Sequence, residues 1–142
     1  MNELVNESIR EALLIFNPKA GRAHPGSLER ARKTLASQGI ETQFAPTDGP
    51  GAATEIARRA AAEGCQMVIA CGGDGTLNEV VNGLAGSRVP LALLPAGTAN
   101  VFAKELGLPW NVEKAAALVS ASRLRRIALG CVCSGNHGGQ GR

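Results

Sequence analysis

The chain has 142 residues, of which 44% are hydrophobic and only 3% aromatic, which is enough for one packed domain and too little for two full ones. Its formal net charge of +3 is mild, and no stretch alternates basic with aromatic residues, so the composition argues against nucleic-acid binding and leaves a weak attraction to anionic surfaces open. No apolar run approaches the roughly 18 residues of a membrane span, and the polar start MNELVNESIRE is unlike a signal peptide, so we expect a cytoplasmic protein.

Short apolar runs alternate with longer amphipathic segments, which is typical of βα units that feed a parallel sheet. In chain order we expect a strand at 12–16, a helix at 27–37, a strand at 42–45, a helix at 52–62, a strand at 67–70, a helix at 76–84, a strand at 91–94, and helices at 99–106 and 112–121. The pattern predicts an α/β fold of Rossmann-like type, with three layers and a mostly parallel sheet.

Three glycines fall just past predicted helices, where a left-handed closing residue is favoured, namely Gly39, Gly64 and Gly107. No linker, repeat or low-complexity block interrupts residues 12–121, so we place the visible domain boundary near residue 122. A flexible tail is expected beyond it, because residues 134–142 are mostly glycine and polar.

The four cysteines are predicted to be reduced thiols. Cys65 and Cys71 lie beside or within an apolar strand, whereas Cys131 and Cys133 lie in the terminal tail. The tail segment CVCSGNH lacks the second pair of ligands that a closed zinc site needs, so no metal is expected there.

Ligands of open parallel sheets bind beyond the carboxyl ends of the strands, and this chain carries the loops NPKAGRA, PTDGPG, CGGDGT and PAGTAN at those positions. In GGDGT, Gly72, Gly73 and Gly75 would let phosphate oxygens approach the main chain and would allow positive φ. Thr76 is expected to open a helix whose terminal amides favour an anion. Since the carboxylate of Asp74 repels phosphate unless a cation intervenes, Mg²⁺ is its predicted partner, held directly or through water.

Each loop also has a purely structural interpretation. GGDG forms a tight turn if Asp74 accepts hydrogen bonds from local amides. Thr76 and Glu79 have the spacing of a capping box, so Glu79 is predicted to be structural. Pro18 restricts the turn that holds Asn17 and Gly21.

The loop after the fourth strand follows the same logic as GGDGT. Gly97 would permit close approach of a ligand, and Thr98 and Asn100 would donate hydrogen bonds to a ribose or phosphate. Neither a P-loop nor the GxGxxG of an ordinary dinucleotide fold is present. His24 and His137 have no nucleophile and acid spaced for a hydrolase triad, so both are expected at the surface.

Taken together, NPKAG (17–21), PTDGPGAATEIA (46–57), GGDGTLNEVVNGL (72–84) and LPAGTANVFAKELGLP (94–109) resemble the catalytic domain of the diacylglycerol kinase and sphingosine kinase family, in particular its bacterial lipid kinases. The resemblance divides the chain into a lead at 1–11, a nucleotide-binding catalytic domain at 12–129 and a tail at 130–142. The expected fold is the α/β domain of the type shared by NAD kinases and diacylglycerol kinases.

The resemblance implies an ATP site between this domain and a following β-rich domain, with the γ-phosphoryl group passing to a lipid hydroxyl at a membrane surface. Asp74 would be the catalytic residue and would organise Mg²⁺ and the phosphates, most simply through water. The residues implied in nucleotide binding are Asn17, Gly21, Thr47, Gly72, Gly73, Asp74, Gly75, Thr76, Leu77, Asn78, Thr98 and Asn100.

Two features depart from the family pattern. Val101 stands where many relatives carry an aspartate, as it also does in lipid kinases with GTANVFA. The chain ends where relatives continue into the second domain, which carries much of the lipid site and the usual catalytic base, so we expect weak turnover by this chain alone. A cleft and apolar surface exposed in this way would favour association between copies of the chain, so a homo-oligomer is one of the expected states.

Three functions remain open on the sequence. The first is an ATP-dependent lipid kinase domain, the second a nucleotide-binding module without transfer, and the third an NAD kinase, which shares GGDGT but not the other loops. Arg123, Arg125 and Arg126 are interpreted as a solvated strand edge rather than a membrane-facing patch.

Overall fold

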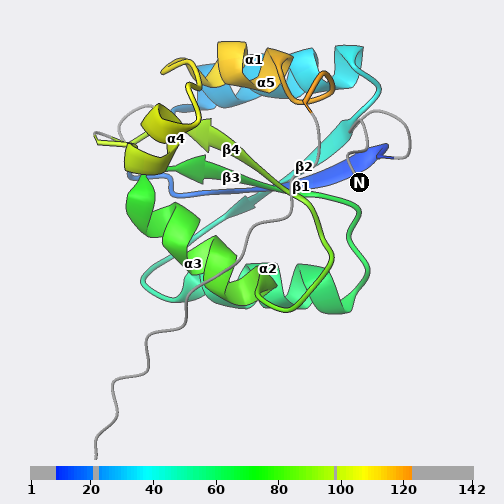
Figure 1. Cartoon of the computed structure of the whole chain (residues 1–142), viewed down its shortest axis with the longest axis vertical. Coiled ribbons are helices and arrows are strands. Elements are labelled where there is room, and N and C mark those ends of the chain that lie inside the picture. The colour runs from blue at the N-terminus through cyan, green and yellow to red at the C-terminus, as the bar shows by residue number, and fades with distance from the viewer. Residues whose placement is uncertain (1–8, 21–22, 98, 123–142) are drawn as a thin grey trace, which may run out of the picture.

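A computed structural model describes residues 9–20, 23–97 and 99–122. Its centre is a four-stranded parallel sheet in the order β2-β1-β3-β4 (Figure 1). The strands are β1 (Glu11–Phe16), β2 (Glu41–Pro46), β3 (Val68–Gly72) and β4 (Leu91–Pro95). All four predicted strands are confirmed, and so is the α/β class.

Helices cover both faces of the sheet, which gives the three predicted layers (Figure 1). One face carries α1 (Pro25–Ser37) and α5 (Val112–Ala117), and the other carries α2 (Ala52–Ala62) and α3 (Asp74–Leu84). A short α4 (Val101–Glu105) lies beside the ends of β3 and β4 (Figure 1).

Successive side chains of the central strands point to opposite faces of the sheet, so each strand contributes to both hydrophobic cores. In β1, Leu14 packs with the α1 and α5 side, and its neighbour Ile15 packs with the α2 and α3 side. In the same way Ile69 of β3 belongs to the first cluster and Val68 to the second. Every residue of β3 is buried, which explains why its sequence is continuously apolar rather than alternating.

The helix boundaries differ from the prediction where capping contacts decide them. Helix α1 begins two residues early, at Pro25, because proline suits a first helical position and His24 caps the helix by accepting from the Ser27 amide (3.3 Å). Helix α3 also begins early, at Asp74 rather than Thr76. Helices α4 and α5 are shorter than predicted, at 101–105 and 112–117.

The expected closing glycines and free thiols are confirmed within the described residues. Gly39, Gly64 and Gly107 have φ of +84°, +76° and +70°, the left-handed region expected after a helix. Cys65 and Cys71 are free thiols. The predictions for His137, for Cys131 and Cys133, and for the three arginines at 123, 125 and 126 lie outside the described residues. No helix in the described ranges is long and apolar enough to cross a bilayer.

The capping box predicted for Thr76 and Glu79 is wrong. Gly73 is the N-cap of α3, and among the described residues no side chain accepts from the first amides of that helix. Glu79 instead reaches the neighbouring helix, where its Oε1 accepts from the Ala53 amide (3.2 Å), while its main-chain oxygen accepts from Thr54 Oγ1 (2.9 Å). Glu79 is structural, as expected, but it joins α3 to the N-terminus of α2.

Candidate functional site

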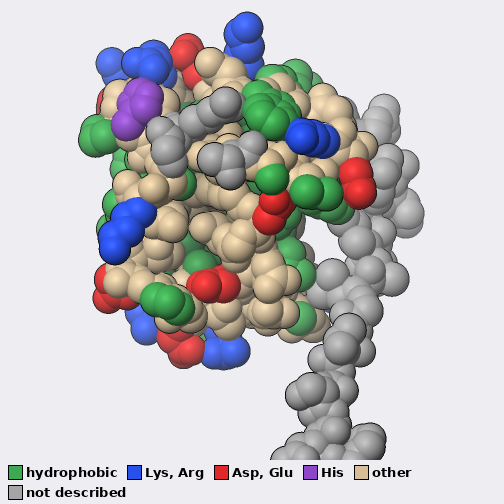
Figure 2. Space-filling model, turned by 90° about the vertical axis from the view of Figure 1, so that its left-hand side faces the viewer, with side chains coloured by type: hydrophobic (Ala, Val, Ile, Leu, Met, Phe, Trp, Pro, Cys, Tyr) green, Lys and Arg blue, Asp and Glu red, His purple; other side chains and the backbone are tan. Residues whose placement is uncertain are grey.

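An open cavity of about 430 Å³ lies at the carboxyl ends of the strands, where the loops after β1, β3 and β4 meet. Figure 2 views this edge and shows a recessed centre of backbone and of side chains that are neither charged nor hydrophobic, flanked by charged and apolar groups. The cavity is lined by Asn17, Lys19, Ala20, Gly73, Asp74, Gly75, Thr76, Gly97 and Ala99. All of these belong to three of the four loops singled out from the sequence.

The N-terminus of α3 opens into this cavity, and no described side chain accepts a hydrogen bond from its first amides. The first turn of any helix leaves amide groups without intrahelical partners. In the described part of the chain, each of the other helices offers one such amide to a side chain: the acceptors are His24 for α1, Glu79 for α2, Asp74 for α4 and Asn111 for α5. Helix α3 has no such acceptor, so its amides are available to an anion.

Asp74 is the carboxylate of the site. Its Oδ1 accepts a hydrogen bond from the Val101 amide (2.8 Å), so one oxygen has a structural partner, but this partner lies 27 residues along the chain and is not the local amide of the predicted tight turn. The side chain is exposed and lines the cavity, and within the described residues no bond to its Oδ2 is formed. One oxygen is therefore available to a ligand.

The residues present fit Mg²⁺ only together with a phosphate. No group of three or more His, Cys, Asp or Glu side chains gathers at any point of the described chain, so the described residues offer no closed metal cage. Mg²⁺ commonly uses one or two carboxylates and completes its shell with water and substrate phosphates. Asp74 beside the open α3 N-terminus matches that arrangement.

The glycines of the site serve mainly to bring two loops together. Contrary to expectation, Gly72, Gly73 and Gly75 do not have positive φ. A Cβ on Gly72 would lie 2.8 Å from Thr76 Oγ1, and one on Gly97 would lie 2.4 Å from the Cα of Gly73. Only Gly75, where a Cβ meets nothing within 4 Å, faces open space as the phosphate argument requires.

The loop after β1 contributes a cation that the sequence analysis did not single out. Asn17 Oδ1 accepts from the Lys19 amide (2.9 Å), which forms a tight turn. Lys19 is exposed and lines the cavity. The sequence could have indicated this residue, because Lys19 lies within the NPKAG motif and a lysine in a loop at a strand end can neutralise the charge of a bound phosphate.

The structure does not bring every predicted residue to the cavity. Thr47 sits at the same edge, where its amide donates to Phe16 O (2.9 Å), but it does not line the cavity. Leu77 is buried in the core below α3, and Asn78 is exposed outside the cavity. Gly21 and Thr98 lie outside the described residues. The roles of all these residues toward a ligand stay predictions.

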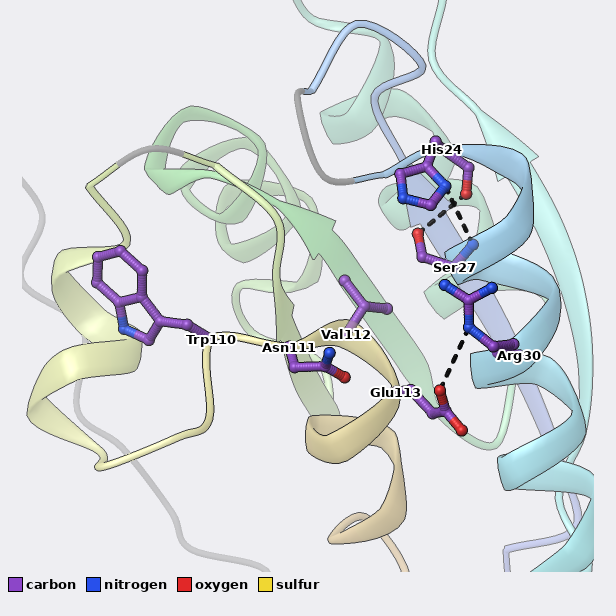
Figure 3. Close-up of a pocket in the computed structure, with 7 residues that line it drawn as sticks. All are labelled: His24, Ser27, Arg30, Trp110, Asn111, Val112 and Glu113. Atoms are coloured by element: carbon purple, nitrogen blue, oxygen red, sulfur yellow. Dashed lines mark hydrogen bonds and ion pairs between the residues drawn. The ribbon is translucent and has the colours of Figure 1, made fainter.

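A second cavity of about 270 Å³ lies between the starts of α1 and α5 (Figure 3). The ion pair between Arg30 Nε and Glu113 Oε1 (3.3 Å) crosses it, and His24 and Ser27 bond to each other at its upper end. Arg30 and Glu113 thus pair with each other across this cavity, so we interpret it as a gap in the packing of two helices rather than as a reaction site.

Comparison with known proteins points to one family. Residues 11–132 match the model of the diacylglycerol kinase catalytic domain. A diacylglycerol kinase of Bacillus subtilis strain 168 is 40% identical over 128 residues, covering 87% of this chain and 42% of that protein. A diacylglycerol kinase of Staphylococcus carnosus strain TM300 is 35% identical over 124 residues, covering 85% of this chain and 40% of the relative.

Solved structures agree with the sequence matches. The crystal structure of a diacylglycerol kinase from Bacillus anthracis strain Sterne superposes with a TM-score of 0.72 at 36% identity, covering 80% of this chain and 40% of that one. The chain thus spans about 40% of the length of such relatives. With the family model matched over residues 11–132, the chain belongs to the diacylglycerol kinase catalytic-domain family of lipid kinases.

Proposed function

We propose that this chain binds ATP with Mg²⁺ in the cavity at the carboxyl edge of the sheet, as the nucleotide-binding part of a lipid kinase. The observation that carries the proposal is the N-terminus of α3, whose amides meet no side-chain acceptor in the described structure and open into that cavity. A helix N-terminus of this kind favours phosphate through its free amides and its dipole. Asp74 and Lys19 line the same space.

The charges around the cavity suit a phosphoryl transfer, which depends chiefly on positioning and on neutralising charge. The amides of Gly75 and Thr76 would donate to phosphate oxygens, and Lys19 would offset their negative charge. Asp74 Oδ2 would hold Mg²⁺, directly or through water. When bound, Mg²⁺ would supply positive charge that offsets the phosphates and lowers the repulsion felt by an approaching hydroxyl.

The lipid acceptor is part of the proposal on the strength of the relatives, which are named diacylglycerol kinases. The hydroxyl of a diacylglycerol-like lipid would accept the γ-phosphoryl group, with the protein located in the cytoplasm and in contact with the membrane surface. The family match disfavours an NAD kinase. Experiment distinguishes a lipid kinase from a module that binds nucleotide but transfers no phosphoryl group.

Titration calorimetry of the 142-residue chain with ATP, with and without Mg²⁺, tests the nucleotide site. The informative variant is Asp74→Asn, because an asparagine can still accept from the Val101 amide and removes only the charge. We expect Mg²⁺-dependent binding that Asp74→Asn weakens at least about tenfold, the loss of roughly one charged interaction. The matched control is Glu63→Gln, an exposed carboxylate at the far end of α2.

Transfer is measured separately with labelled ATP and vesicles that contain diacylglycerol. Slow labelling of the lipid, abolished by Asp74→Asn, would support a kinase. Saturable binding without any labelled lipid would favour the module without transfer. If ATP bound to neither the unmodified chain nor Glu63→Gln, the proposed nucleotide site would be refuted.

A further inference from the structure

The side chain of Asn100 bonds back to the main chain of the loop that follows β4. Asn100 is 3% exposed, and its side-chain amide makes a reciprocal pair with one peptide unit: Oδ1 accepts from Gly97 N (3.0 Å) and Nδ2 donates to Gly97 O (2.8 Å). Both polar atoms face the protein, although Asn100 was predicted to donate to a ligand. The arrangement is that of a brace inside the loop.

The same residue has a strained backbone. Asn100 is the one non-glycine residue with positive φ in the described chain, at φ +50° and ψ +53°. Asparagine tolerates this left-handed conformation better than most residues, but it still costs free energy that neighbouring contacts must offset. The conformation ends the loop and begins α4, since Asn100 O accepts from the Lys104 amide (3.0 Å).

The loop that Asn100 holds is in direct contact with the main chain of Gly72 and Gly73, just before α3. Ala96 N donates to Gly72 O (2.9 Å), which continues the β3–β4 pairing beyond the strand ends. At the next step a Cβ on Gly97 would lie 2.4 Å from Gly73 Cα, so the two backbones touch. The position of Gly97, which Asn100 holds, is therefore tied to the position of Gly73.

The residue after Asn100 completes the connection, because the Val101 amide donates to Asp74 Oδ1 (2.8 Å). The backbone angles of Asn100 set the direction of that amide. Asp74 is exposed, so without this bond its carboxylate would be free to turn among several rotamers.

We infer that Asn100 is a positioning residue: by bracing Gly97 and turning the chain, it aims the Val101 amide at Asp74 Oδ1 and so leaves Oδ2 in place for the metal and phosphates. The inference rests on the proposed function and deepens it. Asn100 acts through Asp74 and touches neither nucleotide nor metal in this scheme. Pre-set orientation of a carboxylate is what a site dependent on positioning requires.

The first test follows the Val101 amide itself by hydrogen exchange in NMR spectra of the full 142-residue chain. In Asn100→Ala the Val101 amide should exchange at least about tenfold faster, as expected when a hydrogen bond to a charged group is lost. In Asp74→Asn it should stay protected. Asn100→Gly, which keeps the left-handed backbone and loses only the brace, gives the same comparison if the alanine variant does not fold.

The second test measures the ratio of ATP affinity with Mg²⁺ to that with chelator. Asn100→Ala should lower this ratio about tenfold. The matched control is Asn111→Ala, which removes another asparagine cap: the Lys114 amide donates to Asn111 Oδ1 (2.9 Å) at the start of α5. This variant should leave the ratio unchanged. In an Asp74→Asn background, Asn100→Ala should have no further effect on the ratio.

The outcomes separate the inference from the function on which it rests. If the unmodified chain binds no MgATP, the proposed function and this role both fail. If it binds and Asn100→Ala keeps the full metal dependence, the inference alone is overturned. It is also overturned if Asn111→Ala lowers the ratio equally, or if Asn100→Ala remains effective in the Asp74→Asn background.

Discussion

The two acidic side chains of α3 near the site accept hydrogen bonds from other helices rather than from their own. Glu79 caps a neighbouring helix, Asp74 accepts from the start of α4, and Asn100 holds a loop that touches the turn before α3. Local patterns such as a capping box describe bonds within one helix. They could not reveal these partners, which are 26 residues away for Glu79 and 27 for Asp74.

Cys71 precedes the glycine turn and is fully buried, and burial raises the pKa of its thiol from 9.0 to about 12. A folded pKa above the unfolded value gives stability that is complete below about pH 9 and is lost as pH rises toward 12. We expect the free energy of unfolding to fall more steeply between pH about 8 and about 10.5 in the unmodified chain than in Cys71→Ala. Urea unfolding at both pH values measures this, and equal slopes would contradict the burial of the thiol.

At the scale of elements, contacts with neighbours decide where helices begin and how closely they pack. The regular strands were predictable because a buried parallel strand is continuously apolar, as Val68–Gly72 is. The early start of α3 at Asp74 was not predicted; its N-cap Gly73 is in close backbone contact with Gly97 of another loop, which a local pattern does not reveal. The same holds for α4, which begins only after the left-handed Asn100.

Gly83 marks the closest contact between α2 and α3. A Cβ on this residue would lie 2.4 Å from Thr54 O and 2.7 Å from Ala57 Cβ. Alanine gains about 1 kcal/mol in helix propensity, but a backbone oxygen cannot move aside, so we expect Gly83→Ala to lower the free energy of unfolding by about 1–2 kcal/mol net. The control Asn82→Ala, at an exposed neighbouring position, should unfold no earlier in urea; a more stable Gly83→Ala would refute the contact.

For the whole molecule, the two cores on opposite faces of the sheet share the same central strands. Leu14 and Ile69 face one core, and their neighbours Ile15 and Val68 face the other. Loss of either helix layer would therefore expose residues that alternate along β1 and β3. This sharing predicts one cooperative unit.

Unfolding should show one transition, whichever probe is used. Trp110 is the single tryptophan and lies before α5 on one face, whereas circular dichroism reports all helices. Urea midpoints from the two signals should coincide, and Gly83→Ala in the opposite layer should shift both equally. Separate midpoints, or a shift confined to circular dichroism, would show that the layers unfold independently.

The sequence by itself determined the alternation of strands and helices, the glycine-containing loops at the strand ends and the family, because apolar periodicity and short glycine motifs are local and ordered along the chain. Only the tertiary structure decided which of those residues line the cavity. It placed Lys19 there and kept Leu77 and Asn100 in the interior. It also brought Gly73 and Gly97, which belong to different loops, into direct backbone contact. The physical reason is that a hydrogen bond or a backbone contact depends on distance in space, and residues 74 and 101 become neighbours only when β3 pairs with β4.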